Sequence, residues 1–310
     1  MSSTTIAAPR RRAGAGLRLA PYLFVLPFVV LFVWFLIAPI FVAVGTSMFR
    51  ETSSGLGFGT ANETAFVWFE QYAKALQDED FLAGFGRVLL YGVVQVPVMI
   101  VISAVLALLF DSALVKGKRF FQLAVFLPYA VPGVIAALLW GFLYQPSVSP
   151  LVAGLRSIGI PADFLSPGTV LWSIANVGIW STVGINMIIL FSALQSVPRD
   201  MYEAAKLDGA GELRIATAIK IPMIWPAVLL TTLSSIIGTL QLFNEPAVLK
   251  TITSNISSDY TPNMAIYAAS TTANDPNLAS AMAILLGVAT FILSVLIMKI
   301  TTRRKGVNQA

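Results

Sequence analysis

Cysteine and histidine are both missing from this chain of 310 residues. Without cysteine the chain forms no disulfide. Without histidine it lacks the commonest metal ligand and the commonest general base. We therefore expect no catalytic, cofactor-binding or metal-ligating residues, and we do not expect the chain to be an enzyme.

Charged residues are also scarce. They make up 11% of the chain, whereas soluble domains carry roughly 25%, and apolar residues make up 57%. The mean hydropathy is +0.80. A transmembrane helix needs about 20 consecutive apolar residues to cross a hydrocarbon core about 30 Å thick. Six stretches meet this requirement, at about 19–48, 88–110, 120–144, 170–197, 221–243 and 279–298. The sequence therefore predicts an all-α integral membrane protein with six spans.

The first of these spans follows a basic segment and could be mistaken for a signal peptide. A signal peptide has an apolar region of about 7–15 residues that ends at a small-residue cleavage site. The apolar stretch here is much longer and ends in "IAPIFVAVGTSMF". We expect it to be retained as a membrane helix, with a cleaved signal as the alternative.

The distribution of lysine and arginine predicts the orientation, because cytoplasmic loops of membrane proteins are enriched in both. With the N-terminus inside, fifteen of the twenty basic residues lie on the cytoplasmic side and five lie outside. Both termini are then cytoplasmic, in basic tails at residues 1–18 and 301–310 that flank a transmembrane domain at residues 19–300. The fifteen are Arg10, Arg11, Arg12, Arg18, Lys116, Lys118, Arg119, Arg199, Lys206, Arg214, Lys220, Lys299, Arg303, Arg304 and Lys305.

Three connections then lie outside. The loop at 50–87 contains "FVWFEQYAKAL", whose aromatic residues suit a helix at the membrane interface. The segment 146–169 is rich in proline and glycine, and its "SPLVAGLRSIG" is a possible short helix. The loop at 244–278 is polar and carries turn signals at Pro246, "SSDYTPN" and "NDPN".

The most charged segment is the predicted cytoplasmic connection "VPRDMYEAAKLDGAGELRIATAIKIP" at 197–222. Ser196 and Pro198 are typical of a helix start, and acidic residues at 200 and 203 favour a helix N-terminus. Gly209 is typical of a helix stop, and "ELRIATAIK" favours a second helix. The loop reads as helix, glycine turn, helix. It is either a plain connector or a rigid shape on which another protein docks.

The same segment resembles a known motif. "EAAKLDGAG" followed by "IKIPMIWP" is similar to the EAA loop of binding-protein-dependent ABC importer permeases. The preceding "LQSVPRDMY", the third span's "FLPYAVPGVIAALLWGFLY" and the fourth span's "GINMIILFSALQSVP" resemble the carbohydrate-uptake branch, which includes the maltose permeases. Leu213 and Ala216 stand where the family often has an aromatic pair. The residues that match the EAA motif are Glu203, Ala204, Ala205, Asp208, Gly209 and Ala210.

The resemblance implies an ABC type I importer permease fold in the bacterial plasma (inner) membrane. It implies that Glu203 faces basic residues of an ATPase and that Gly209 lets the chain turn closely against it. The chain would form half of a pore beside a second homologous permease. Two ATPase subunits, which use ATP and Mg, would dock at residues 199–222, and an extracytoplasmic solute-binding protein would deliver the cargo. The lipid bilayer is also an expected partner, whereas nucleic acid is not. The expected cargo is a di- or oligosaccharide, with a polyol or a glycerol phosphate as the alternative.

The sequence itself lacks an ATP site of the P-loop type, G-x-x-x-x-G-K-[S/T]. Its Gly117-Lys118 pair has no glycine five positions upstream and is followed by Arg119. A partner must therefore supply the energy, or an ion gradient must. An ion-driven carrier usually places ionisable residues inside its spans, and the six predicted spans contain none.

A solute would pass between helices, and spans four and five carry the polar residues for such a path. These residues could instead hold helices together. Pro97, Pro128 and Pro132 should kink or interrupt the second and third spans. The candidates for the path are Ser181, Thr182, Asn186, Ser235, Thr239 and Gln241.

Overall fold

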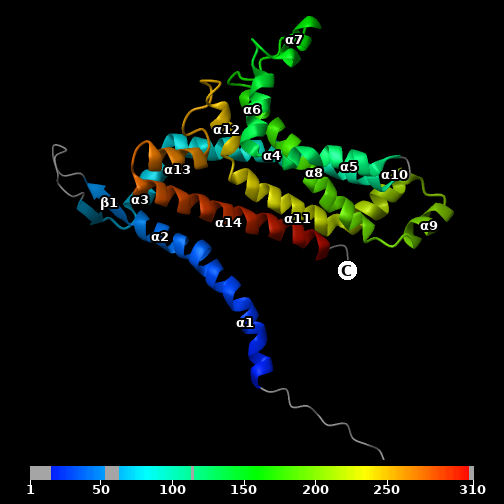
Figure 1. Ribbon diagram of the computed structural model, residues 1–310, viewed down its shortest axis with the longest axis horizontal. Helices are drawn as coiled ribbons and strands as arrows, with labels where there is room; N and C mark the ends of the chain where they lie inside the picture. The colour runs from blue at the N-terminus through cyan, green and yellow to red at the C-terminus, as the bar shows by residue number, and fades with distance from the viewer. Residues whose placement is uncertain (1–14, 53–62, 113–114, 307–310) are drawn as a thin grey trace, which may run out of the picture.

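Long helices lie side by side through the body of the molecule (Figure 1). The computed structural model describes residues 15–52, 63–112 and 115–306. Residues 1–14 and 307–310 of the predicted tails lie outside the described residues. The first half of the described chain contains α1 Ala15–Phe32, a π-helical turn Val33–Ile37, α2 Ala38–Ser47, β1 Phe49–Thr52, β2 Glu63–Phe66, α3 Glu70–Gln77, α4 Glu79–Asp111, α5 Lys118–Phe126, a 3-10 turn Leu127–Ala130 and α6 Gly133–Tyr144. The second half contains α7 Pro150–Ser157, α8 Val170–Gln195, α9 Asp200–Leu207, α10 Glu212–Ile215, a π-helical turn Ala216–Lys220, α11 Ile221–Leu240, α12 Asn244–Leu249, α13 Pro262–Thr271 and α14 Pro276–Gly306.

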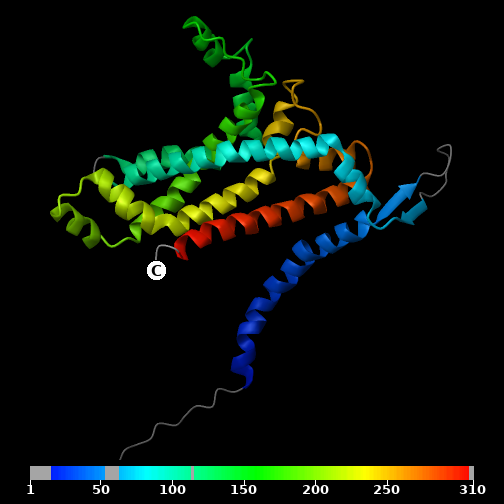
Figure 2. The ribbon, with the colours of Figure 1, turned by 180° about the vertical axis from the view of Figure 1, so that it is seen from behind.

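The prediction of an all-α membrane protein is confirmed. In the described part of the chain, five helical segments are long and apolar enough to cross a membrane, and a bent helix pair makes a sixth if it counts as one span. Helices α4, α8, α11 and α14 form the bundle, which is clear from both sides (Figures 1 and 2). Helix α1 diverges from this bundle, whereas α2 contacts α14. None of the most apolar 18-residue window within Pro21–Ser47 is buried, although Ser47 at the end of α2 is buried.

The bent pair is the predicted third span. Residues 120–144 do not form one straight crossing, because α5 and α6 meet at an angle of 97°. The break follows from proline chemistry. Pro128 lies in the 3-10 turn, and Pro132 forces the preceding Val131 into an extended conformation. The predicted interruption at these prolines is confirmed, and α6 projects sideways from the bundle (Figure 1).

Pro97 was predicted to kink or interrupt the second span, and it does not interrupt it. Helix α4 runs through Pro97 for 33 residues and begins nine residues earlier than expected. Asp78 starts it by accepting a hydrogen bond from the Phe81 amide at 2.9 Å. Pro97 is exposed, whereas Val96 and Met99 are buried. Packing on both sides of the proline therefore offsets the one hydrogen bond that it removes.

Two of the predicted outer connections hold more structure than their sequences indicate. In the 50–87 loop, β1 and β2 pair antiparallel, with Phe49 opposite Phe66, and the expected interfacial helix is reduced to α3. The 244–278 loop contains α12 and α13 rather than turns alone. Thr261 caps α13 through the Met264 amide, and Pro262 occupies its first position. The short helix expected within 146–169 is confirmed as α7.

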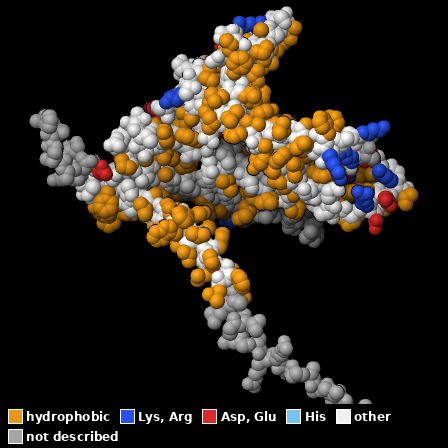
Figure 3. Space-filling view, viewed as in Figure 1, with side chains coloured by type: hydrophobic (Ala, Val, Ile, Leu, Met, Phe, Trp, Pro, Cys, Tyr) orange, Lys and Arg blue, Asp and Glu red, His pale blue; other side chains and the backbone are white. Residues whose placement is uncertain are grey.

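Buried side chains form several clusters along the bundle. One cluster lies at the end where α9 attaches, and it contains Ala107, Phe110, Met187, Leu190, Leu194, Val197 and Ile224. Basic side chains also gather at that end, over α5, α9 and α10, whereas apolar side chains cover much of the visible face elsewhere (Figure 3). We call this basic end the α9 end, and the end that carries β1, β2, α3 and α13 the hairpin end.

Candidate functional site

The segment that resembles the EAA motif is a short helix followed by a glycine turn. Helix α9 ends at Leu207, and Gly209 has a φ of +82°, which is the left-handed conformation that ends many helices. The Gly209 amide donates to the Lys206 carbonyl at 3.0 Å, and the Ala210 amide donates to the Ala205 carbonyl at 2.9 Å. The predicted helix and glycine stop are both present.

The second helix of this loop differs from the prediction. Helix α10 continues through the π-helical turn at Ala216–Lys220 directly into α11. Therefore "ELRIATAIK" forms the first turns of the fifth span rather than a separate helix. The start of α9 also differs, because Arg199 precedes it without a side-chain cap, and the Ser196 hydroxyl donates to Ala193 of α8 instead.

The loop presents apolar side chains to solvent on both sides of the glycine turn. Leu207 is 89% exposed and Leu213 is 81% exposed. Glu203 lies on the same loop and is also exposed. Exposed large apolar side chains beside charges, at the charged end of a membrane protein, indicate a surface for another protein. We call the exposed residues Glu203, Leu207, Gly209 and Leu213 the α9 surface.

Tyr202 attaches α9 to the bundle. Its ring packs against the buried cluster at the α9 end, and the Lys220 ammonium lies 5.0 Å from the ring centre. Its hydroxyl is buried and has no hydrogen-bond partner in the described part of the chain. Burial, and then the negative charge of Asp111, raise the pKa of Tyr202 above its ordinary value. The phenol therefore stays neutral at physiological pH.

A buried ion pair lies beneath this attachment. The Lys220 ammonium is 2.5 Å from a carboxylate oxygen of Asp111, and the two side chains are only 7% and 11% exposed. The Gln195 amide donates to the other Asp111 oxygen at 2.9 Å. Asp111 ends α4, Gln195 ends α8, and Lys220 directly precedes α11, so three spans meet at one carboxylate.

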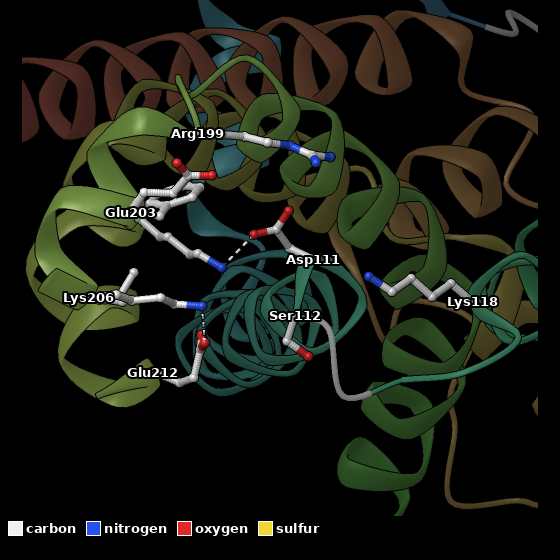
Figure 4. A pocket seen from close by; sticks show the side chains of 10 residues that line it. Asp111, Ser112, Lys118, Arg199, Glu203, Lys206 and Glu212 are labelled. Carbon is white, nitrogen blue, oxygen red and sulfur yellow. Dashed lines mark hydrogen bonds and ion pairs between the residues drawn. The ribbon is translucent and has the colours of Figure 1, made fainter. Parts of the chain in front are cut away.

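Asp111 and Lys220 line a hollow of about 300 Å³ between the loop and the ends of the spans. Figure 4 shows this hollow from close by. A second ion pair closes one side of it, where Lys206 of α9 lies 2.7 Å from Glu212 of α10. This pair is about half exposed, so it contributes little to stability. It connects the two sides of the glycine turn. The side chains around the hollow belong to Asp111, Ser112, Lys118, Arg199, Tyr202, Glu203, Lys206, Glu212, Ile215 and Lys220.

The sequence did not identify the Asp111–Lys220 pair. Asp111 is simply the polar residue that ends one apolar stretch, and Lys220 is one of several basic residues that precede another. They are 109 positions apart. The available signal is that both lie at helix ends on the same predicted side of the membrane, but that signal does not select this lysine among the others.

The structure brings three of the predicted pathway residues together. Thr182 and Asn186 of α8 approach the Met99 sulfur on α4, at 2.9 and 3.4 Å. Thr239 of α11 lies 3.4 Å from the Gln95 oxygen on α4. These three residues face helix α4 inside the bundle.

The other three predicted pathway residues lie apart. The Ser181 hydroxyl is buried with no hydrogen-bond partner among the described residues. The Ser235 hydroxyl donates to the backbone of Thr231 at 2.7 Å. Gln241 lines a separate hollow with Asn263 and Thr290. The six residues therefore do not form one site within this chain.

A second hollow, of about 430 Å³, lies between α6 and the start of α8 and is lined mainly by aromatic side chains. The Tyr144 hydroxyl donates to the Ser173 carbonyl at 3.0 Å and accepts a hydrogen bond from the Asn176 amide at 2.9 Å. Aromatic faces beside an amide and hydroxyls are features of carbohydrate sites. The sequence signal for this hollow is the density of Trp and Tyr in 140–180. The side chains around this hollow, which we call the aromatic recess, belong to Trp140, Tyr144, Leu151, Phe164, Thr169, Trp172, Ser173 and Asn176.

The bent third span, the α9 loop and the apolar bundle define a membrane permease. Residues 99–306 match the family described as "Binding-protein-dependent transport system inner membrane component", and the chain belongs to this family. It is therefore a transport subunit of the inner membrane, as the resemblance implied.

Individual relatives support this assignment. The chain is 29% identical over 216 residues to the sn-glycerol-3-phosphate transport system permease protein UgpA of Yersinia pestis, covering 69% of this chain and 71% of the relative. It is 29% identical over 237 residues to the probable ABC transporter permease protein YurN of Bacillus subtilis, covering 75% and 79%.

Solved structures share the fold. A bacterial ABC transporter involved in the import of the acidic polysaccharide alginate matches with a TM-score of 0.77 at 22% identity, covering 92% of this chain and 95% of that chain. The alginate transporter in complex with a pentasaccharide-bound periplasmic protein matches with a TM-score of 0.78 at 21% identity, covering 92% and 94%. The expectation of an ABC importer permease fold is confirmed.

Proposed function

We propose that this chain is half of the translocation pathway of an ATP-driven importer and that the α9 surface docks an ATPase subunit. The observation that carries the proposal is the pair of exposed leucines, Leu207 and Leu213, beside Glu203 at the basic end of the molecule. Apolar side chains surrounded by charge suit a protein partner better than lipid. The positive-inside rule places this basic end in the cytoplasm, where ATP is available.

We infer that a separate subunit supplies the energy. The chain has no P-loop, so hydrolysis falls to a separate subunit. Two such subunits would serve this chain and a second, related permease. The apolar α1–α2 segment, which buries none of its window within this chain, is available to that second permease or to lipid. A solute-binding protein on the opposite side delivers the cargo, and the family description supports this partner.

We propose a carbohydrate as the cargo. The aromatic recess supports a neutral sugar, because none of the side chains around it is basic. The predicted pathway residues Thr182, Asn186 and Thr239, which face α4, can donate hydrogen bonds but carry no charge. The proposed pathway also includes Ser181, Ser235 and Gln241, which would line it together with residues of the second permease.

A glycerol phosphate is the second candidate, and the name of the UgpA relatives favours it. The two cargoes can be separated by uptake of a labelled oligosaccharide and of labelled glycerol 3-phosphate into cells that carry the complete transporter. An ion-driven carrier would lose uptake with an uncoupler and keep it without the ATPase.

The docking proposal is tested by gentle purification of the tagged chain, with mass spectrometry of the proteins that co-purify. We expect a P-loop ATPase and a second permease. Gly209→Val should remove the ATPase, because valine does not tolerate a φ of +82°. Gly159→Val is the matched control, since Gly159 has a φ of +81° in a turn after α7, and neither glycine has an atom within 4 Å of an added Cβ. The control should keep the ATPase.

Two outcomes would count against the proposal. Recovery of the wild-type chain alone, as a stable homo-oligomer in several mild detergents, would contradict the importer assembly. Equal loss of the ATPase from both glycine variants would show that turn strain in general, rather than the α9 surface, controls the assembly.

A further inference from the structure

We propose that Asp111 is a positioning residue that makes helix α4 move together with the α9 loop, so that α4 carries the movement to the hairpin end of the molecule. This inference rests on the proposed function, in which α9 receives the movement of the ATPase. It assigns a role to a buried carboxylate that neither the EAA motif nor the pathway residues include.

The first argument is the convergence on Asp111. One oxygen of its carboxylate binds Lys220 at 2.5 Å, and the other accepts from Gln195 at 2.9 Å. The same Lys220 ammonium lies over the Tyr202 ring of α9. Asp111, Lys220 and Tyr202 therefore form a continuous contact from the end of α4 to the docking helix.

The second argument is burial. Both side chains of the Asp111–Lys220 pair are at most 11% exposed, whereas both side chains of the Arg50–Glu70 and Lys206–Glu212 pairs are 46–55% exposed. A buried charge whose partner moves away is left uncompensated, so the two groups must move together. Exposed pairs lack this constraint, because water solvates each charge when it separates.

The third argument is the shape of α4. It is an unbroken helix of 33 residues, about 50 Å long at 1.5 Å per residue. The helix continues through Pro97 without a break, and it packs against α8. A displacement at Asp111 is therefore passed along one rigid element rather than absorbed at a joint.

The far end of α4 is also attached to a neighbouring segment. The Arg87 guanidinium donates to the Tyr260 carbonyl at 3.1 Å and lies 4.9 Å from the centre of the Tyr260 ring. A Cβ at Gly84 would lie 3.1 Å from the Pro262 nitrogen, so the α4 backbone lies close to the start of α13. The segment 260–262 should therefore move together with α4. In the predicted orientation this segment belongs to the outer connection 244–278.

The test uses the complete transporter, with the second permease, the ATPase and the binding protein, reconstituted in vesicles. Asp111→Asn preserves the shape of the side chain and an acceptor for Gln195, but it removes the charge opposite Lys220. Asp111→Glu retains the charge. Lys74→Met is the matched control, because it removes the Lys74–Asp275 ion pair, in which the lysine is 58% exposed. Two quantities are measured, ATP hydrolysis and solute molecules transported per ATP.

A second readout follows the hairpin end directly. The chain has no cysteine, so a spin label at Leu82→Cys occupies a unique and 45% exposed site near the start of α4. Its spectrum is recorded in each background with and without ATP and vanadate. If Asp111 only stabilised the fold, its substitution would lower the yield or the melting temperature but would not change the number of solute molecules transported per ATP.

We expect Asp111→Asn to keep the ATPase bound and hydrolysing while solute transported per ATP falls about tenfold, a size typical of coupling between sites. The ATP-dependent change of the Leu82→Cys label should disappear. Asp111→Glu should retain most of the coupling, and Lys74→Met should behave as the wild type.

The proposal is overturned if Asp111→Asn lowers hydrolysis and transport in equal proportion, or leaves the ratio and the label unchanged. Loss of the ATPase on purification of Asp111→Asn would also overturn it, because the pair would then only build the docking site. A wild-type chain that binds no ATPase would instead overturn the proposed function, so the two failures are distinct.

Discussion

At the scale of single residues, neighbouring helices decide what a glycine does. A Cβ on Gly184 of α8 would collide with the Val125 carbonyl oxygen and come within 2.7 Å of the Phe126 Cα, both on α5. A Cβ on Gly287 of α14 would meet no atom within 4 Å. The same residue type therefore permits a close helix contact at one site and leaves open space at the other.

This contrast predicts opposite effects of one substitution. Gly184→Ala should destabilise the protein by about 1–3 kcal/mol, because backbone atoms of α5 must shift. Gly287→Ala should be neutral or stabilising by up to about 1 kcal/mol, because alanine is the better helix former. Thermal unfolding in one detergent compares the two variants. Equal melting temperatures would contradict the close contact between α5 and α8.

Tyr202 gives a second prediction at this scale. Its hydroxyl is buried without a partner in the described residues, so Tyr202→Phe should change the free energy of unfolding by less than about 0.5 kcal/mol or stabilise the protein. Tyr202→Ala removes the ring beneath Lys220 and should cost about 2 kcal/mol. Melting temperatures and ATPase co-purification measure both effects. A damaging Tyr202→Phe would reveal a hydroxyl contact that the structure lacks.

Sequence patterns predict residues whose role is local and miss those whose role depends on distant partners. Gly209 was predicted because many helices end with a residue in the left-handed conformation just after the last turn, and this residue is usually glycine. Asp111 was missed because its partners, Gln195 and Lys220, belong to other spans. The importance of Thr182 to the α4 contact likewise depends on Met99, which is 83 positions away.

At the scale of elements, helices α2 and α4 show two different uses of an apolar sequence. The α1–α2 segment is apolar but exposed, whereas α4 buries one face against α8 and α13. Amino-acid composition predicts that both the α1–α2 segment and α4 span the membrane, because an apolar sequence is stable in lipid whether or not protein covers it. Only the folded structure shows which face meets protein.

Matched phenylalanines test this difference. Phe81 of α4 is 1% exposed and packs among residues of α3, α13 and α14. Phe35, in the π-helical turn that links α1 to α2, is 66% exposed. Phe81→Ala should cost about 3–5 kcal/mol, whereas Phe35→Ala should leave the melting temperature of the isolated chain nearly unchanged. A large effect at Phe35 in the isolated chain would contradict the exposed first span.

The sequence missed two kinds of element, for different reasons. Strands β1 and β2 are four residues each, too short for a periodic pattern, and each is stabilised by pairing with the other. Helix α13 begins at Thr261–Pro262, which had been interpreted as a turn signal. The same two residues also cap helices, so the local sequence alone does not distinguish the two structures.

At the scale of the whole molecule, charge asymmetry predicts how the protein lies in the membrane. Most of the basic side chains on the visible face gather at the α9 end (Figure 3), whereas the predicted outer connections hold β1, β2, α3, α7, α12 and α13. Labelling tests this arrangement cleanly because an introduced cysteine is unique in the chain. Ile158→Cys, after α7, and Leu207→Cys, in the α9 loop, replace side chains that are 69% and 89% exposed.

We expect a membrane-impermeant maleimide to modify Ile158→Cys in intact spheroplasts and to modify Leu207→Cys only after the membrane is opened. Mass spectrometry of the purified chain reports both sites. Modification of Leu207→Cys in intact spheroplasts, with Ile158→Cys protected, would reverse the orientation and place the α9 surface away from cytoplasmic ATP.

The two attachments of α4 also set a length. Between Arg87 and Asp111 the helix has an apolar stretch about 35 Å long, close to the thickness of a typical hydrocarbon core. Both ends are held, one by the Tyr260 segment and one by Lys220. A free helix relieves a change in bilayer thickness by tilting. Helix α4 cannot tilt without loosening a contact at one end, so the acyl-chain length of the surrounding lipid acts on this transporter as a mechanical load.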